Sequence, residues 1–240
     1  MIPKIIHYCW FGRGEMPELV LRCIDSWKKH LPDYTLCLWS EDNFDIASAP
    51  RYVQEAYAAK KYAFVSDYVR LCALEQEGGL YMDVDFEVYK SFDDLMDNYA
   101  AFAGYEGSKK NPVMMGVLAA APHHPWIQAM MATYADRRFV REDGSLDMTP
   151  NTGYFYDWMT RQGFVADGVE KDWNGVHILP VEYFCPGLTT GENIRCEHTY
   201  CEHKGLHSWS GKGGWKAMIM QYMPQKLKTK LIKLKRKIFK

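Results

Sequence analysis

The stretch YAFVSDYVRLCALEQEGGLYMDVDFE, residues 62–87, decides the fold of this chain because it combines two different periodicities. Its first half has apolar residues at three- and four-residue spacing, which predicts an amphipathic helix over residues 63–76. On that helix Asp67 and Arg70 are three residues apart and therefore share a face. Gly78 and Gly79 are expected to end the helix through a left-handed cap.

The second half predicts a short buried strand that ends in two acidic residues. Residues 80–82, Leu-Tyr-Met, form the apolar run, and Asp83 and Asp85 follow it. Two carboxylates separated by one residue at a strand end point the same way, so together they can hold a hard divalent cation that carries a diphosphate. An isolated D-x-D would be a solvated acidic turn. Here the D-x-D follows this strand and the Asp67–Arg70 helix, which favours a functional polar cluster.

Length and composition indicate one domain with an α/β core. The chain has 240 residues, of which 48% are hydrophobic. We expect the domain to span residues 1–220, with a basic tail over residues 221–240. No run approaches the roughly 20 apolar residues that cross a bilayer, and no signal-peptide core follows Met1, which predicts a cytoplasmic protein. The seven cysteines are odd in number and mostly lie in apolar runs, which fits a reducing compartment.

The order of predicted elements is typical of a sheet with helices on its faces. Strands at residues 1–10, 34–39 and 80–82 alternate with helices at residues 17–30, 51–61 and 63–76, which predicts that these strands are parallel. Further strands are expected at residues 101–105, 113–119 and 176–180, further helices at 126–134 and 154–162, and a loop at 136–150. Parallel sheets bind ligands at the carboxyl ends of their strands, where Trp10 and Asp83 lie.

Three segments together resemble the glycosyltransferases that have a DXD sugar-binding region. The segments are IPKIIHYCWFG at residues 2–12, the stretch from Ser66 to Asp85, and HSWSG with the following Trp215 at residues 207–215. This family includes initiating mannosyltransferases, bacterial capsule transferases and, more distantly, the glucosylating domain of large clostridial toxins. The resemblance implies a GT-A-type fold, in which a Rossmann-like mixed sheet is flanked by helices. It also implies a nucleotide-sugar donor, a divalent metal and retention at the anomeric carbon.

The same resemblance implies roles for the donor-binding residues. Trp10, with Phe11 beside it, is similar to the aromatic residue that stacks on the donor base. Asp67 and Arg70 are similar to the pair that contacts the donor sugar and its diphosphate, for which the fixed fork of Arg is suited. As alternatives, Trp10 is a core residue and the pair is a helix salt bridge. Tyr81 either lines the pocket or belongs to the core.

The metal ligands implied by the resemblance are Asp83, Asp85 and a late histidine. His207 matches that histidine, and His203 is a competing alignment. An imidazole beside two carboxylates suits Mn²⁺ better than Mg²⁺. Either Trp209 or Trp215 would close over the diphosphate.

The function that follows is metal-dependent transfer of a hexose-type sugar from a UDP- or GDP-sugar to a saccharide acceptor, in cell-surface polysaccharide or glycolipid synthesis. Asp83, Asp85 and Arg70 form the expected catalytic set, with help from Lys212, because positive charge stabilises the leaving diphosphate. One alternative is a non-catalytic saccharide- or nucleotide-binding protein. The other is a metal-dependent phosphatase, whose D-x-D usually follows the first strand and continues with Thr.

The tail QKLKTKLIKLKRKIFK, residues 225–240, has leucines and an isoleucine at helical spacing among basic residues. A basic amphipathic helix of this kind binds an anionic leaflet, which predicts a peripheral protein on the cytoplasmic face of the membrane and a lipid-linked saccharide acceptor. A solvated basic terminus is the alternative. Nucleic acid is not the expected partner, because no acidic residue follows Glu202 and the rest of the chain is acidic.

Overall fold

The computed structural model describes residues 1–107, 112–186 and 195–205. By its internal contacts the chain divides into two units, residues 1–204 and 205–240, and the elements below all belong to the first. The predicted domain boundary at residue 220 and the predicted tail helix lie outside the described residues. Within the described part, no helix is both long and apolar enough to cross a membrane.

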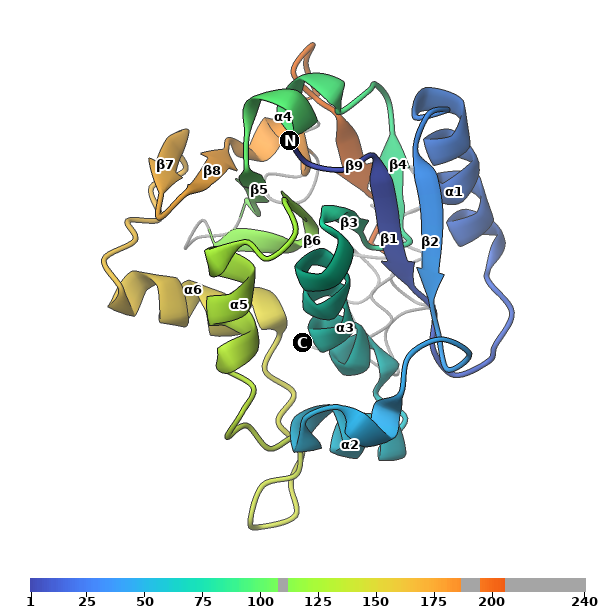
Figure 1. The fold of residues 1–240 in the computed structure, drawn as a ribbon, viewed down its shortest axis with the longest axis vertical. Coiled ribbons are helices and arrows are strands. Elements are labelled where there is room, and N and C mark those ends of the chain that lie inside the picture. Colours follow the sequence, from blue (N-terminus) through green and yellow to red (C-terminus); the bar gives the residue numbers. More distant parts are fainter. Residues whose placement is uncertain (108–111, 187–194, 206–240) are drawn as a thin grey trace, which may run out of the picture. The chain divides into compact units, whose positions relative to one another are not determined.

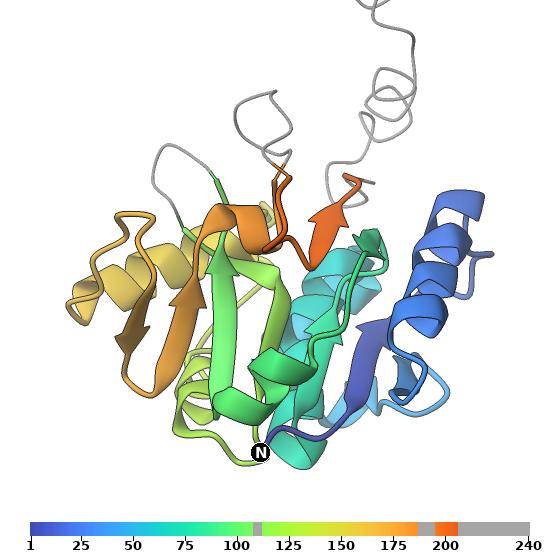
Figure 2. The ribbon, with the colours of Figure 1, turned by 90° about the horizontal axis from the view of Figure 1, so that it is seen from above.

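The first unit is built on a mixed sheet whose strands have the order β2-β1-β3-β6-β5-β8-β7 (Figure 1). The strands are β1 (Ile5–Cys9), β2 (Thr35–Trp39), β3 (Gly79–Met82), β5 (Ala101–Tyr105), β6 (Val113–Ala120), β7 (Lys171–Trp173) and β8 (Val176–Leu179). Figure 2 shows them side by side, from the orange strands at one edge to the blue strands at the other. A separate antiparallel pair consists of β4 (Phe86–Val88) and β9 (Cys201–His203).

The strand directions confirm the predicted α/β class with a mixed sheet. Strand β1 pairs in parallel with both β2 and β3, as the alternation of strands and helices predicts. Strand β6 is antiparallel to β3 and β5, and β5 is parallel to β8, so the sheet is mixed. The short strands β4, β7 and β9 were not predicted, because runs of three residues are too short to show a periodicity.

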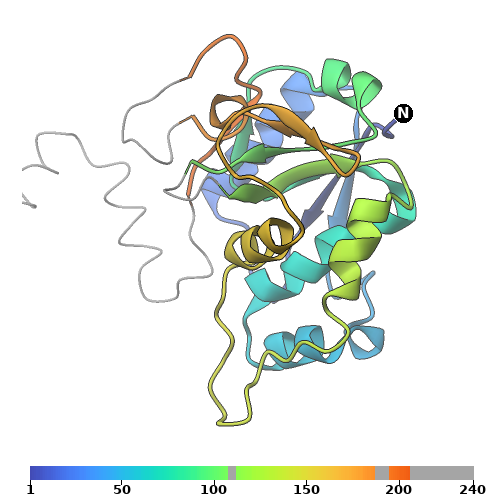
Figure 3. The same ribbon diagram turned by 90° about the vertical axis from the view of Figure 1, so that its left-hand side faces the viewer.

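Helices cover both faces of the sheet. They are α1 (Glu18–His30), α2 (Arg51–Ala58), α3 (Tyr62–Glu77), α4 (Asp93–Asn98), α5 (Pro125–Ala132) and α6 (Asn151–Arg161), with single turns η1 (Ile46–Ser48) and η2 (Val181–Tyr183). In Figure 3, α3, α5 and α6 lie on one side of the sheet and α4 on the other. Alternate residues of each strand therefore meet different layers. Tyr81 packs in the core shared with α3, whereas Phe102 contacts Phe184.

Two glycines let α3 end directly against the sheet. Gly78 caps the helix with φ 64° and ψ −167°, which is an extended left-handed conformation rather than the predicted αL cap, and one that only glycine adopts readily. Gly79 has φ 112°, and a Cβ atom there would lie 2.7 Å from the carbonyl oxygen of Ile5. The buried His7 fastens the same turn, because its Nε2 lies 2.8 Å from the Gly78 carbonyl oxygen while its Nδ1 accepts a hydrogen bond from Trp39.

The predicted loop at residues 136–150 is held to α2 by one carboxylate. Glu55 accepts hydrogen bonds from the backbone N–H groups of Phe139 and Val140 at 2.9 and 3.0 Å, and forms an ion pair with Arg138 at 2.6 Å. Burial raises the pKa of Glu55, but these donors outweigh it and lower the pKa from 4.5 to about 2. The loop is therefore fixed by interactions that require the ionised form of Glu55.

We predict that Glu55→Gln destabilises the protein by about 2 kcal/mol near neutral pH, because hydrogen bonds to the charged carboxylate are lost. A lowered pKa stabilises the folded state above pH 4.5, and this stability is lost as the pH falls toward 2. The difference in free energy of unfolding between wild type and variant, measured by urea titration, should therefore shrink over that interval. Glu142→Gln, an exposed change in the same loop, is the control. A difference that does not change with pH would contradict this account.

Candidate active site

The strand order changes direction between β1 and β3, which makes this position a topological switch point. From β1 the chain passes to β2 on one side, and it later returns to place β3 on the other side. In open α/β sheets ligands bind outside the carboxyl ends of the strands at such a switch point. Trp10 follows β1 and Asp83 follows β3, so the two ends predicted to bind the donor are the two strand ends at the switch point.

Arg70 joins three elements at this position. Its side chain is 5% exposed. Its Nη2 donates to Asp67 at 2.7 Å and lies 3.4 Å from Asp83, while its Nη1 donates to the carbonyl oxygen of Met115 on β6. Its Nε donates to the carbonyl oxygen of Ser66 at 3.2 Å. The predicted pair of Asp67 and Arg70 is present, and it extends to the D-x-D segment, so it is more than a salt bridge within a helix.

Burial and charge act against each other in this network. Burial lowers the pKa of Arg70, but the negative charges of Asp83 and Asp67 raise it overall, so the guanidinium stays charged. Burial raises the pKa of Asp67 to about 6, even though Arg70 opposes that change. The pKa of Asp83 is also raised, again first by burial and then by the nearby Asp85. Arg70 thus faces two carboxylates, those of Asp67 and Asp83, whose combined negative charge exceeds its own positive charge when both are ionised.

Tyr81 and Gly116 set the position of the Asp83 side chain. The hydroxyl of Tyr81 donates to Oδ1 of Asp83 at 2.8 Å, and the guanidinium of Arg70 lies 4.6 Å from the Tyr81 ring centre. Tyr81 is only 1% exposed, so it supports Asp83 as a core residue and does not line a pocket. A Cβ atom at Gly116 would lie 2.9 Å from Oδ2 of Asp83, so the carboxylate needs a glycine at this point of β6.

Asp85 is paired with a histidine from β9. Its Oδ2 lies 3.2 Å from Nε2 of His203, and both residues are buried or nearly so. The antiparallel pairing of β4 with β9 places Phe86 opposite His203, which brings the imidazole to the acidic segment. Burial lowers the pKa of His203, but Asp85 raises it overall. Of the two histidines considered from the sequence, the structure therefore brings His203 to Asp85, while His207 lies outside the described residues.

The two aromatic residues after β1 differ in exposure. Trp10 is partly exposed, and its indole N–H donates to the carbonyl oxygen of Gly14 at 2.6 Å. Phe11 is 7% exposed and packs edge-on against Phe44, with ring centres 6.4 Å apart. The structure thus places Phe11 in the core and leaves a surface of Trp10 open to a ligand. Trp209, Lys212 and Trp215 lie outside the described residues.

The carboxylates of the site suit a hard cation whose coordination shell is completed by other ligands. Among the described residues, no group of three histidine, cysteine, aspartate or glutamate side chains is arranged to hold a metal. Asp83 and Asp85 nevertheless supply carboxylate oxygens, which are the ligands that Mg²⁺ and Mn²⁺ prefer. A cation here would draw its remaining ligands from water, from a diphosphate or from residues outside the described part.

Comparison with known proteins indicates the family to which these site residues correspond. Residues 17–102 match the family described as "Glycosyltransferase sugar-binding region containing DXD motif". That stretch contains Asp67, Arg70, Asp83 and Asp85, the residues that the fold brings to the switch point.

This chain is a glycosyltransferase, and its match to the DXD sugar-binding region spans residues 17–102.

Similarity to individual proteins extends beyond the matched stretch. An uncharacterised glycosyltransferase, L373 of Acanthamoeba polyphaga mimivirus, is 24% identical over 88% of this chain and 84% of its own length. Inositol phosphoceramide mannosyltransferase 3 of Schizosaccharomyces pombe is 29% identical over 52% of this chain. This chain covers only 35% of that yeast protein. The solved structure of the PaToxG glycosyltransferase, 19% identical, covers 68% of this chain and 71% of its own, with a TM-score of 0.49.

Three contributors to the site were not singled out from the sequence. They are the Met115 carbonyl oxygen, Gly116 and the pairing of β4 with β9. The Met115 carbonyl oxygen could not be identified from the sequence, because every residue has a main-chain carbonyl group. Gly116, within an apolar strand, was the available clue, because a glycine there often marks the close approach of another group.

We predict that Arg70→Met destabilises the protein by about 3 kcal/mol, because it leaves the buried carboxylate of Asp67 and the partly exposed carboxylate of Asp83 without their counter-charge. Adding Asp67→Asn should recover part of the loss, since one of those charges is then removed. Urea unfolding followed by tryptophan fluorescence measures both effects. Arg161→Met, at the exposed end of α6, is the control. If Arg70→Met cost no more than this control, the charge network described above would be wrong.

Proposed function

We propose that this glycosyltransferase transfers a hexose-type sugar from a UDP- or GDP-sugar to a saccharide acceptor, with retention at the anomeric carbon and with Mn²⁺ or Mg²⁺ as cofactor. The observation that carries the proposal is the position of Arg70. It lies buried between Asp67 and Asp83 at the switch point, and Asp85, two residues after Asp83, contacts His203 of β9. This arrangement combines an anion-binding cation with carboxylates for a metal and for sugar hydroxyls.

Each residue then has a distinct task. Asp85 is the direct metal ligand, and Asp83 faces the metal together with ribose or sugar hydroxyls. Asp67 accepts a hydrogen bond from a donor-sugar hydroxyl, as a buried carboxylate fixed by Arg70 can do without reorganisation. Trp10 stacks on the base. These roles are supported by the resemblance and by the common position of the residues.

The late metal ligand is either His203 or His207. The 3.2 Å contact with Asp85 favours His203, whose imidazole would add the nitrogen ligand that suits Mn²⁺. When bound, the cation would neutralise negative charge on the departing diphosphate. The residues of the chain contribute orientation. Arg70 keeps Asp67 and Asp83 in place, and its own charge favours the anion that forms. The phosphate oxygen of the leaving group can accept the proton of the acceptor hydroxyl, so no protein base is required.

We predict that UDP or GDP raises the melting temperature of the protein by about 5 °C or more in the presence of Mn²⁺, and that EDTA abolishes this shift. Asp85→Ala should lose the metal-dependent shift, measured relative to its own melting temperature, which falls because His203 loses this contact. Asp25→Ala, which removes an exposed carboxylate on α1, is the control. An undiminished shift in Asp85→Ala would count against a metal ligand at this residue. Release of free nucleotide from a UDP- or GDP-sugar would exclude a non-catalytic binding protein.

The acceptor that we propose is a lipid-linked saccharide at the cytoplasmic face of the membrane. The support is the basic amphipathic pattern of residues 225–240. The S. pombe relative is, by its name, an inositol phosphoceramide mannosyltransferase, which makes a lipid-borne acceptor a natural extension for this chain.

We predict that the full chain sediments with vesicles of anionic phospholipid at low salt and stays in solution with purely zwitterionic vesicles. The expected driving force is about 1 kcal/mol for each basic residue near the anionic surface. A chain that ends at residue 224 should not sediment with either kind of vesicle, and high salt should release the full chain. Equal partitioning of the two chains would refute a membrane role for the tail.

A further inference from the structure

The turn that carries Trp10 is an unusual piece of backbone. Gly12 has φ 94° and Arg13 has φ 56°, so two consecutive residues adopt left-handed conformations. At Arg13 this conformation costs free energy and requires support from the surroundings. Inside the turn, the Trp10 indole N–H donates to Gly14. The backbone N–H of Trp10 donates to the carbonyl oxygen of Trp39 at 2.9 Å. The orientation of the indole therefore depends on how the turn is fastened to its neighbours.

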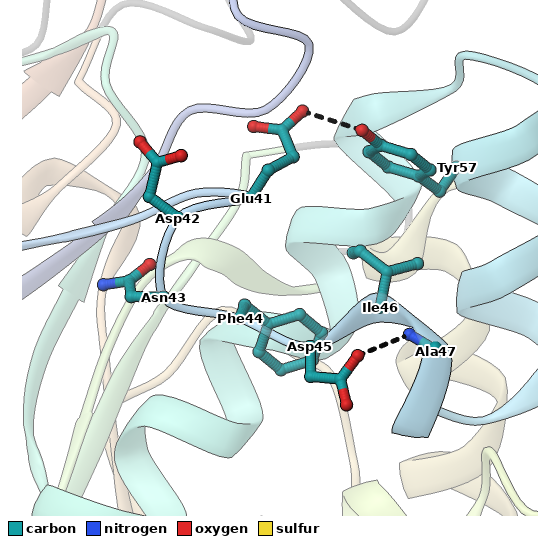
Figure 4. Close-up of a pocket in the computed structure, with 8 residues that line it drawn as sticks. All are labelled: Glu41, Asp42, Asn43, Phe44, Asp45, Ile46, Ala47 and Tyr57. Carbon is teal, nitrogen blue, oxygen red and sulfur yellow. Dashed lines mark hydrogen bonds between the residues drawn. The ribbon is translucent and has the colours of Figure 1, made fainter.

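Glu41 fastens the middle of the turn. Its Oε1 accepts a hydrogen bond from the backbone N–H of Gly12 at 2.6 Å and another from the hydroxyl of Tyr57 at 3.1 Å. Figure 4 shows the second of these bonds, which joins the loop after β2 to helix α2. A hydrogen bond from N–H to a carboxylate is among the stronger kinds in proteins. The other side-chain tie, between Arg13 and Asp42, joins two exposed side chains and contributes little by comparison.

The turn also contacts α3, the helix that carries Asp67 and Arg70. A Cβ atom at Gly12 would lie 2.3 Å from the ring of Tyr62, so the turn rests directly on that ring. Tyr62 is the first residue of α3, and its ring lies 5.6 Å from that of Tyr57. Glu41 and Tyr57 thus hold the turn against the start of α3. This sets the position of Trp10 relative to the helix that carries Asp67 and Arg70.

We infer that Glu41 is a positioning residue for the nucleoside part of the donor, acting through the turn that carries Trp10. The inference rests on the proposed function, in which Trp10 stacks on the base while Asp67 and Arg70 engage the sugar and diphosphate. A single donor molecule must reach both places, so a fixed spacing between them lowers the cost of binding. Glu41 itself does not contact the reacting groups.

Truncation of Glu41 is compatible with folding. The side chain is partly exposed and borders an open pocket of about 570 Å³ lined by residues 41–47 and Tyr57 (Figure 4). Glu41→Ala therefore enlarges a solvent-filled space and leaves no cavity in the core. Glu41→Gln keeps an oxygen that can accept the same two hydrogen bonds. Asp45→Asn removes a charge from the same pocket without touching the turn, because Asp45 contacts the backbone of η1.

The test measures backbone exchange and nucleotide binding in the full chain. In the free protein, amide exchange at Gly12 should be faster in Glu41→Ala than in wild type, while β1 is unchanged. The dissociation constants of UDP and GDP with Mn²⁺, measured by calorimetry, should rise about tenfold in Glu41→Ala. The Michaelis constant for the donor should rise by the same factor, with kcat within twofold of wild type. Glu41→Gln should restore both readouts in large part, and Asp45→Asn should match wild type.

The outcomes separate this inference from the proposed function. If wild type binds nucleotide and Glu41→Ala binds it equally well, Glu41 does not position the base-binding turn, and the proposed function stands. If Asp45→Asn weakens binding as much as Glu41→Ala, pocket charge is responsible and the inference is overturned. If wild type binds neither nucleotide, the proposed function fails and takes this inference with it, even if exchange at Gly12 changes as expected.

Discussion

One buried guanidinium connects the helix and the strands that form the site. Arg70 lies between the carboxylates of Asp67 and Asp83 and also donates to the main chain of β6. Burying a charge is costly unless it is paired and hydrogen-bonded, and here both conditions are met by groups from three separate elements. The position of α3 relative to the end of β3 is thus coupled to the ionisation of the site. The same pairing that stabilises the fold prepares the carboxylates for a ligand.

Close backbone approach is the second constraint, and it depends on glycines. Gly78 and Gly79 allow α3 to end against β1 and to enter β3 within one turn, and Gly116 leaves room for the Asp83 carboxylate. Around them, polar groups of the core are satisfied by specific partners, as His7 is by Gly78 and Trp39. Hydrogen bonds from Arg70 and Tyr81 orient the acidic side chains of this region.

The glycosyltransferase site therefore consists of a fixed centre and two flanking parts. The centre is the network of Arg70, Asp67 and Asp83. On one side, the turn after β1 presents Trp10 and is fastened through Glu41 to the start of α3. On the other side, the β4–β9 pair brings His203 to Asp85. In the proposed function, the base of the donor would stack on Trp10, and its sugar and diphosphate would lie at Asp67 and Arg70.

The sequence by itself determined the elements with strong local signals. The long helix bearing Asp67 and Arg70, the parallel strands around β1 and the position of the D-x-D segment follow from periodicity and from glycine placement, which act within a few residues. Only the tertiary structure decided which distant groups meet the site. Whether His203 contacts Asp85 depends on the pairing of two three-residue strands, and the support from Met115, Gly116 and Glu41 depends on packing between elements far apart in the chain. These contacts join residues that are far apart in the chain, and the local periodicity of a single sequence does not show which distant residues meet.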